Sequence, residues 1–228
     1  MLFLNLSRSR YGNAVRFVNA LIALLLLGTI FFVYPGTTQA VDTVRILALG
    51  DSLSAGHGLL RADSFPSQLE RALVNRGIFA KVTNGGVSGD TSAGGLSRLD
   101  WVLSEGFDGV IVELGANDGL RGVEPKETLK NLDAILSKLK QKKIVVLLTG
   151  MQAPPNLGAE YSKEFKAVFP YLAKKYDLLF YPFFLKGVAA MDDLNQKDII
   201  HPNSKGVGVI VKNILPYVIE MVEVIKTR

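Results

Sequence analysis

The chain has 228 residues, none of which is cysteine and only two of which are histidine. The absence of cysteine excludes a disulfide framework, a zinc site built from thiolates, a cysteine nucleophile and a lipoprotein cysteine. Because histidine is so scarce, any chemistry that needs an imidazole must use His57 or His201.

Acidic side chains are absent from the first 40 positions, whose charged residues are three arginines. The last of them is followed by an uncharged apolar stretch of 18 residues, at 17–34. The segment Thr38-Gln39-Ala40, which contains small residues, precedes Val41. This pattern predicts a signal peptide at residues 1–40, removed before Val41, and a single folded body at residues 41–228. An uncleaved membrane anchor is the alternative, because the stretch approaches the roughly 20 residues that span a bilayer.

Both interpretations predict export. We expect a periplasmic location in a bacterium, or an inner-membrane anchor with the body facing the periplasm, and membrane contact only through an uncleaved N-terminal segment. Removing the three leader arginines from a net charge of +5 leaves a body of charge +2 with no concentrated basic run. This argues against nucleic acid as a partner.

Short apolar runs alternate with longer segments of helical period from Val44 onward. The continuous apolar runs are typical of buried parallel strands, and repeated strand–helix units place helices on both faces of such a sheet. The sequence therefore predicts a three-layer α/β/α sandwich with five parallel strands. The expected strands are 44–49, 79–82, 109–114, 144–148 and 178–181, and the expected helices are about 64–77, 91–104, 125–141, 160–176 and 203 to the C-terminus, with a kink at Pro216.

Residues suited to hydrolytic chemistry follow the predicted strands, where a parallel sheet gathers its functional loops. The first strand ends in Gly50-Asp51-Ser52-Leu53, which offers a serine nucleophile. Gly89 lies in a glycine-rich loop after the second strand, and Asn117 follows the third. Asp198 precedes His201 by three residues, so on one helical turn its carboxylate could accept an imidazole N–H. Each fragment alone is also compatible with an ordinary turn or helix cap.

Taken together, the four blocks resemble those of the SGNH hydrolases, also called GDSL esterases and lipases. The blocks are Gly50-Asp51-Ser52-Leu53, Gly89, Gly115-x-Asn117-Asp118 and Asp198-x-x-His201. The residues around them are most similar to the exported bacterial acyl hydrolases known as arylesterase, thioesterase I or lysophospholipase L1. The resemblance implies a flavodoxin-like fold and hydrolysis of carboxylic esters, including aryl esters, short to medium acyl esters, thioesters and lysophospholipids.

In the expected mechanism Ser52 attacks the acyl carbonyl, His201 accepts its proton, and Asp198 orients His201. The resemblance implies an oxyanion hole formed by the N–H groups of Ser52 and Gly89 and the side-chain amide of Asn117. This mechanism needs no metal and no organic cofactor. The expected partner is a small-molecule or lipid ester, and we expect a monomer.

The substrate-binding residues are predicted on two further loops. Asp118, Gly119 and Leu120 belong to a glycine-rich loop that could move over the site, although Asp118 could equally be a solvated surface charge. Leu120, Pro154 and Leu157 would supply the apolar surface of an acyl groove.

Three alternatives remain open. His57 could replace His201 as the base, although no carboxylate stands at a suitable spacing from it. The same scaffold could carry a carbohydrate deacetylase, although few aromatic residues occur in the predicted site loops. The body could also be an exported binding protein without activity.

Overall fold

The structure is a computed structural model that describes residues 43–228 together with residues 16, 18 and 19. Apart from these three residues, the predicted signal peptide lies outside the described part of the chain. The same holds for its cleavage point and for the alternative membrane anchor. Within the described part of the chain, no helix is both long and apolar enough to cross a membrane.

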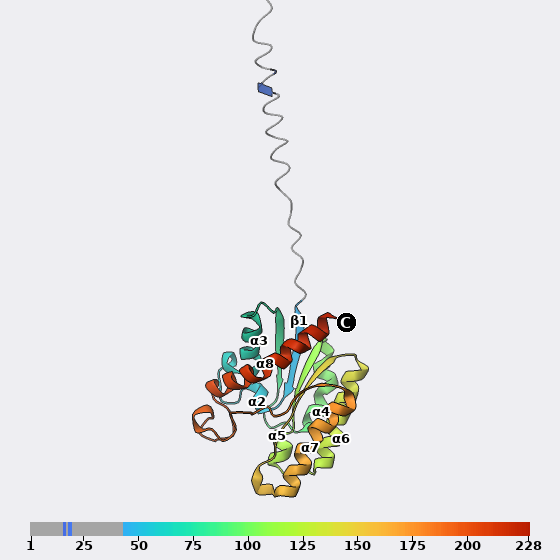
Figure 1. The fold of residues 1–228 in the computed structure, drawn as a ribbon, viewed down its shortest axis with the longest axis vertical. Helices are drawn as coiled ribbons and strands as arrows, with labels where there is room; N and C mark the ends of the chain where they lie inside the picture. Colours follow the sequence, from blue (N-terminus) through green and yellow to red (C-terminus); the bar gives the residue numbers. More distant parts are fainter. Residues whose placement is uncertain (1–15, 17, 20–42) are drawn as a thin grey trace, which may run out of the picture. The chain divides into compact units, whose positions relative to one another are not determined.

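The body is built on one sheet of five parallel strands in the order β2-β1-β3-β4-β5, which confirms the predicted fold class (Figure 1). Helices cover both faces of the sheet. On one face α3 packs against α8, and on the other α6 packs against both α4 and α7. The strands are β1 (Val44–Gly50), β2 (Ala80–Gly86), β3 (Gly109–Glu113), β4 (Val145–Thr149) and β5 (Leu179–Tyr181); the long helices are α3 (Phe65–Val74), α4 (Ser92–Val102), α6 (Pro125–Gln141), α7 (Ala159–Tyr176) and α8 (Ser204–Lys226).

Short helical segments complete the chain between these elements. Two of them, α2 and α5, directly follow strands at the carboxyl edge of the sheet, and four are 3-10 turns. They are α2 (Ser52–Ala55), α5 (Ala116–Leu120), η1 (Arg61–Asp63), η2 (Leu103–Glu105), η3 (Pro155–Leu157) and η4 (Asp192–Leu194). The segment after β3, expected as a loop, is thus a short helix.

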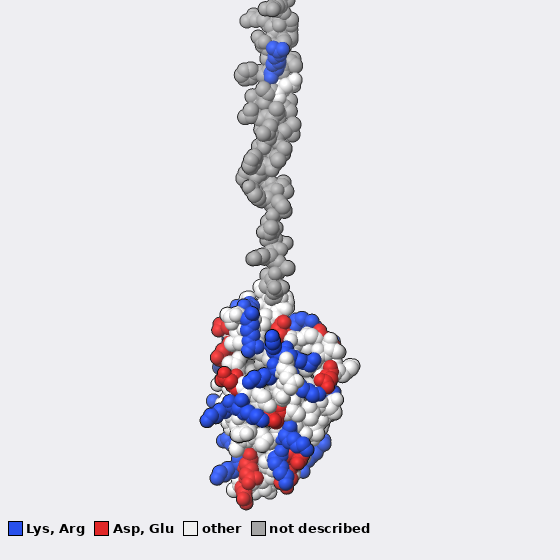
Figure 2. Space-filling model, turned by 90° about the vertical axis from the view of Figure 1, so that its right-hand side faces the viewer, with Lys and Arg blue, Asp and Glu red and all other residues white. Residues whose placement is uncertain are grey.

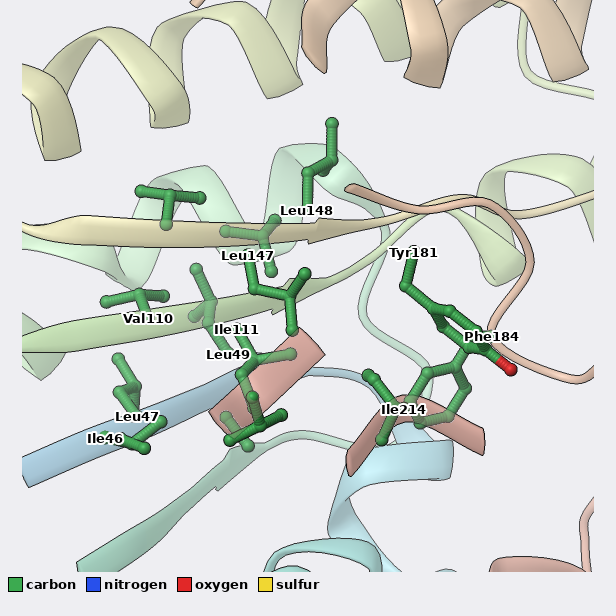
Figure 3. Close-up of a cluster of buried hydrophobic side chains, with 14 of the residues drawn as sticks. Ile46, Leu47, Leu49, Val110, Ile111, Leu147, Leu148, Tyr181, Phe184 and Ile214 are labelled. Atoms are coloured by element: carbon green, nitrogen blue, oxygen red, sulfur yellow. The ribbon is translucent and has the colours of Figure 1, made fainter. Parts of the chain in front are cut away.

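The central strands are buried on both faces because a helical layer covers each side. Every residue of β3 and β4 is buried. Figure 3 shows buried side chains of β1, β3 and β4 in this core, with Tyr181 of β5 beside Phe184 and Ile214 of α8. This core fixes the strand ends that carry the candidate site.

Strand β2 is longer than the apolar pattern indicates, because it continues through Gly85 and Gly86. A Cβ on Gly86 would lie 2.3 Å from the backbone nitrogen of Ala55 in α2. The glycines read from the sequence as loop residues therefore belong to a strand against which α2 packs closely. Pro216 lies inside α8, which continues past it to Lys226.

Candidate active site

Ser52 is the first residue of α2, directly after β1. Asp51 caps this short helix, since its Oδ1 accepts the N–H of Leu53 at 2.9 Å. Gly50 is required for space, because a Cβ there would lie 2.3 Å from Ser54 Oγ and 2.4 Å from Glu113 Oε2. The local sequence thus sets a hydroxyl at the carboxyl edge of the sheet.

His201 and Asp198 reach Ser52 from the segment before α8. His201 Nε2 lies 3.0 Å from Ser52 Oγ, and His201 Nδ1 lies 2.6 Å from Asp198 Oδ2. Oδ1 of Asp198 also accepts the N–H groups of Ile200 and His201, each at 3.0 Å. The structure therefore brings the three predicted residues together, although in an irregular turn and not in the helical turn that the spacing suggests.

The hydrogen bonds to Asp198 also set its charge. The backbone N–H and then the side chain of His201 lower the pKa of Asp198 to about 2. Its carboxylate is therefore ionised throughout the neutral range and can orient and stabilise a protonated His201.

His57, the alternative base, lies beside His201 and not between it and Ser52. The two rings are tilted by 40° with their centroids 4.5 Å apart. No hydrogen bond joins the His57 side chain to Ser52 or to a carboxylate among the described residues. The geometry therefore favours His201 as the base and makes His57 part of the wall beside it.

The predicted oxyanion-hole residues face the same cavity as Ser52. Asn117 Nδ2 donates a hydrogen bond to Asp51 Oδ2 at 3.0 Å, which fixes the side-chain amide in place. Gly89 has a φ of +86°, a conformation that favours glycine, and its carbonyl accepts a hydrogen bond from Arg121 Nη2 at 2.9 Å.

A salt bridge that the sequence analysis missed holds the Gly89 turn. Arg98 Nε lies 2.6 Å from Asp90 Oδ2, and Arg98 Nη2 donates to the carbonyl of Gly50 at 2.9 Å. Arg98 thus ties the turn after β2 to the end of β1. The sequence does show an acidic loop residue followed by a helix that contains an arginine, which is compatible with a salt bridge. The spacing alone, however, does not show where the guanidinium points.

Glu113, at the end of β3, is fully buried and lies next to Ser54 of α2. Its Oε2 accepts a hydrogen bond from Ser54 Oγ at 2.8 Å, whereas Oε1 has no partner among the described residues. Burial, and then the nearby Asp51, raise the pKa of Glu113 well above its ordinary value. Burial also raises the pKa of Asp51, to about 6. We assign the proton to Glu113 at neutral pH, because burial raises its pKa well above the ordinary value and one of its oxygens has no partner in the described part of the chain, whereas both oxygens of Asp51 accept an N–H hydrogen bond.

A cavity of about 670 Å³ opens at Ser52 and His201. Two predicted substrate-binding residues, Leu120 and Pro154, line it, whereas Gly119 and Leu157 do not. The remaining apolar walls come from segments without a recognisable motif, so the sequence pattern does not predict them. These walls include Met151, Phe183, Leu185, Ala190, Ile199 and Ile200.

Asp118 does not contact the cavity, contrary to the expectation that it binds substrate. It is only 1% exposed. Its carboxylate accepts hydrogen bonds from the N–H and hydroxyl of Ser92, at 2.7 and 2.5 Å, and from the Thr128 hydroxyl at 3.1 Å. Since its carboxylate is directed at α4 and α6, Asp118 is neither a solvated charge nor a substrate ligand but joins α5 to both helices.

Comparisons with known proteins agree with this geometry. A model of the GDSL-like Lipase/Acylhydrolase family matches residues 48–209. The chain is 38% identical to Esterase TesA of Pseudomonas aeruginosa over 195 residues, which are 85% of this chain and 96% of that protein. It is 40% identical to Thioesterase 1/protease 1/lysophospholipase L1 of Escherichia coli over 168 residues, which are 73% of this chain and 79% of the other. The crystal structure of AlinE4, an SGNH-hydrolase family esterase, shares 49% identity and a TM-score of 0.67, covering 78% of this chain and 96% of AlinE4.

Proposed function

Because the chain belongs to the GDSL-like lipase/acylhydrolase family and is a carboxylic ester hydrolase, we propose that Ser52, His201 and Asp198 carry out the reaction through an acyl-enzyme. The observation that carries this proposal is the continuous hydrogen-bonded series from Ser52 Oγ through the His201 ring to Asp198, at 3.0 and 2.6 Å. A hydroxyl is too weak a nucleophile to attack an ester unaided, and this arrangement supplies the base it needs.

In the first half of the reaction, Ser52 Oγ attacks the acyl carbon while its proton moves to His201 Nε2. Asp198, which is ionised, keeps His201 oriented and stabilises the imidazolium. The negative charge on the substrate oxygen is stabilised by the N–H groups of Ser52 and Gly89 and by Asn117 Nδ2. When the carbonyl re-forms, the alcohol or thiol leaves with the proton from His201.

The second half repeats these steps with water as the nucleophile. His201 accepts a proton from water, the hydroxide attacks the acyl-enzyme, and the carboxylic acid leaves as Ser52 recovers its proton. Apolar walls at Leu120, Pro154 and Phe183 support an acyl chain as the recognised group. The substrate class we propose comprises aryl esters, short to medium acyl esters, thioesters and lysophospholipids.

The proposed location is the periplasm, after removal of residues 1–40. The arginine-containing leader and its apolar stretch support export. The compact unit that contains the site begins at Asp42, next to the predicted new N-terminus. In addition, 78% of this chain matches 96% of AlinE4. AlinE4, which is an esterase, therefore has little beyond the part that corresponds to the body.

A substrate panel tests the proposal. The body and its Ser52→Ala variant are assayed with p-nitrophenyl esters of graded chain length, an acyl thioester, a lysophospholipid and an acetylated sugar. We expect acyl esters to be cleaved by the parent alone. Equal rates for the two proteins would disprove the serine mechanism, and cleavage of the acetylated sugar alone would favour a deacetylase.

A further inference from the structure

Large apolar side chains are exposed around the mouth of the catalytic cavity. We call five of them the mouth rim: Val87, Leu120, Met191, Ile199 and Ile200, each between 45% and 58% exposed. Leu120, Ile199 and Ile200 line the cavity, and Val87 and Met191 directly adjoin the lining residues Ser88 and Ala190. Single exposed apolar residues are ordinary, but a group of them around one opening marks a surface that contacts something apolar.

The backbone of two rim segments supports this interpretation. Ile199 has a φ of +61° and Ala190, next to Met191, a φ of +60°. The left-handed region is rare for residues other than glycine, and a β-branched residue such as isoleucine is a clear outlier there. Among the described residues, Lys143 and Asp177 also have a positive φ, but they lie just after the C-terminal ends of α6 and α7, where this conformation is common. At Ile199 the strained backbone holds a large apolar side chain in solvent. Because the residue is 58% exposed, burial of this side chain does little to offset the cost of the strain.

Charged residues of both signs lie next to the rim, without an excess of basic ones. They are two basic and three acidic residues, all exposed: Arg121, Lys197, Asp192, Asp193 and Asp198. Because a surface without excess positive charge is not attracted to an anionic lipid layer, the apolar rim matches a zwitterionic headgroup layer better.

We propose that the mouth rim seats the enzyme on a zwitterionic phospholipid surface, so that an acyl chain passes from the lipid layer directly into the catalytic cavity. The rim contacts the layer while Met151, Phe183 and Leu185 continue the apolar surface inward. The transfer of the acyl chain rests on the proposed function, whereas the seating itself does not. This contact differs from the sequence-based expectation, in which only an uncleaved N-terminal segment touches the membrane.

The test measures seating without catalysis. The Ser52→Ala body, residues 41–228, is sedimented with sucrose-loaded phosphatidylcholine vesicles, so that neither the leader nor turnover contributes. The test variant carries Val87→Ser and Met191→Ser, at residues 45% and 48% exposed that do not line the cavity. The matched control carries Val74→Ser and Phe79→Ser, at residues 48% and 49% exposed at the end of α3 and before β2, on the edge of the sheet opposite the site.

The rim variant should lower the vesicle partition coefficient by about tenfold, since interfacial binding scales with buried apolar area, and the control should leave it unchanged. Circular dichroism melting checks that both variants fold; Ile199→Gly, which relieves strain and removes an apolar group, provides an independent rim variant. The proposal fails if the parent does not bind vesicles or if rim and control variants bind alike. It also fails if ultracentrifugation shows a dimer that only the rim variant disrupts, because a second copy then covers the surface.

An activity assay separates this proposal from the catalytic one. With Ser52 intact, the Val87→Ser/Met191→Ser variant should hydrolyse soluble p-nitrophenyl acetate at the parental kcat/KM and lose about tenfold on vesicle-embedded lysophospholipid. An equal loss on both substrates would overturn the seating proposal. Absence of hydrolysis by the parent would overturn the proposed function but not the vesicle result.

Discussion

Asn117 illustrates how one side chain can serve both the local structure and the reaction. One N–H of its amide is held by Asp51, which leaves the other for the developing oxyanion. Asn117→Ala should therefore lower kcat by about 10²–10³ with little change in KM, because the donor acts mainly in the transition state. Steady-state kinetics on a soluble ester measure this. A purely structural role would instead lower the melting temperature and leave kcat of the folded fraction unchanged.

Substitution of the two histidines should affect kcat very differently. His201→Ala should reduce kcat by at least about 10³, because the base is lost. His57→Phe should retain kcat within about tenfold, since an aromatic ring can keep the packing against His201. Active-site titration of both variants normalises the rates. Full activity in His201→Ala with loss in His57→Phe would reverse the assignment of the base.

The raised pKa of Glu113 should make the stability of the protein depend on pH. Its native pKa is raised above 4.5, so the native state keeps a proton that the unfolded chain releases. This contribution is present below pH 4.5 and declines as the pH rises towards the native pKa, by up to about 1.4 kcal/mol per pH unit. Glu113→Gln removes the titrating group, so urea unfolding should show the variant gaining on the parent from pH 5 to pH 8. Parallel stability curves would contradict the assignment.

At the scale of elements, Asp118 is the joint between α5, α4 and α6. Asp118→Ala leaves the N–H and hydroxyl of Ser92 and the hydroxyl of Thr128 without this acceptor. We expect the free energy of unfolding to fall by about 2–4 kcal/mol, because these groups are buried. Urea unfolding measures the loss. Leu120→Ser, on the exposed end of the same short helix, is the control and should change stability little.

The same helix shows what sequence reasoning could and could not predict. The continuous apolar runs of β3 and β4 correctly predict buried strands, because strands of a parallel sheet that is covered on both faces are apolar on both sides. The motif around Asn117 placed that residue at the sheet edge. It could not show that Asp118 is directed away from the cavity, since this depends on Ser92 and Thr128 from distant segments. The long-range bridge from Arg98 was missed for the same reason.

At the scale of the whole molecule, the leader hypothesis makes a prediction about mass. Protein recovered from the periplasm of an expressing bacterium should begin at Val41, so its intact mass should be that of residues 41–228 and not the 24.8 kDa of the full chain. Mass spectrometry of the periplasmic and membrane fractions measures this. Recovery of the full-length chain in the membrane fraction alone would establish the anchor instead.

The surface charge of the body bears on its partners. Figure 2 shows basic side chains with acidic ones interspersed over the face that it presents. The described residues include ion pairs such as Lys138 with Asp100 and Lys175 with Asp133, at 2.7 and 2.5 Å. Such pairing leaves less free positive charge than a phosphate-binding surface needs, in keeping with the +2 expected for the body.

The parallel sheet also constrains how the chain folds. Ile46 of β1 pairs with Gly109 of β3, 63 residues later in the chain, and none of the described strands forms a hairpin with another. Parallel pairing of this kind needs a crossover connection, so each strand pair joins distant segments of the chain, a topology that favours slow folding. The central pair cannot form until β3 has been synthesised. The sheet is therefore completed late in synthesis, which is compatible with the export that we propose for this protein.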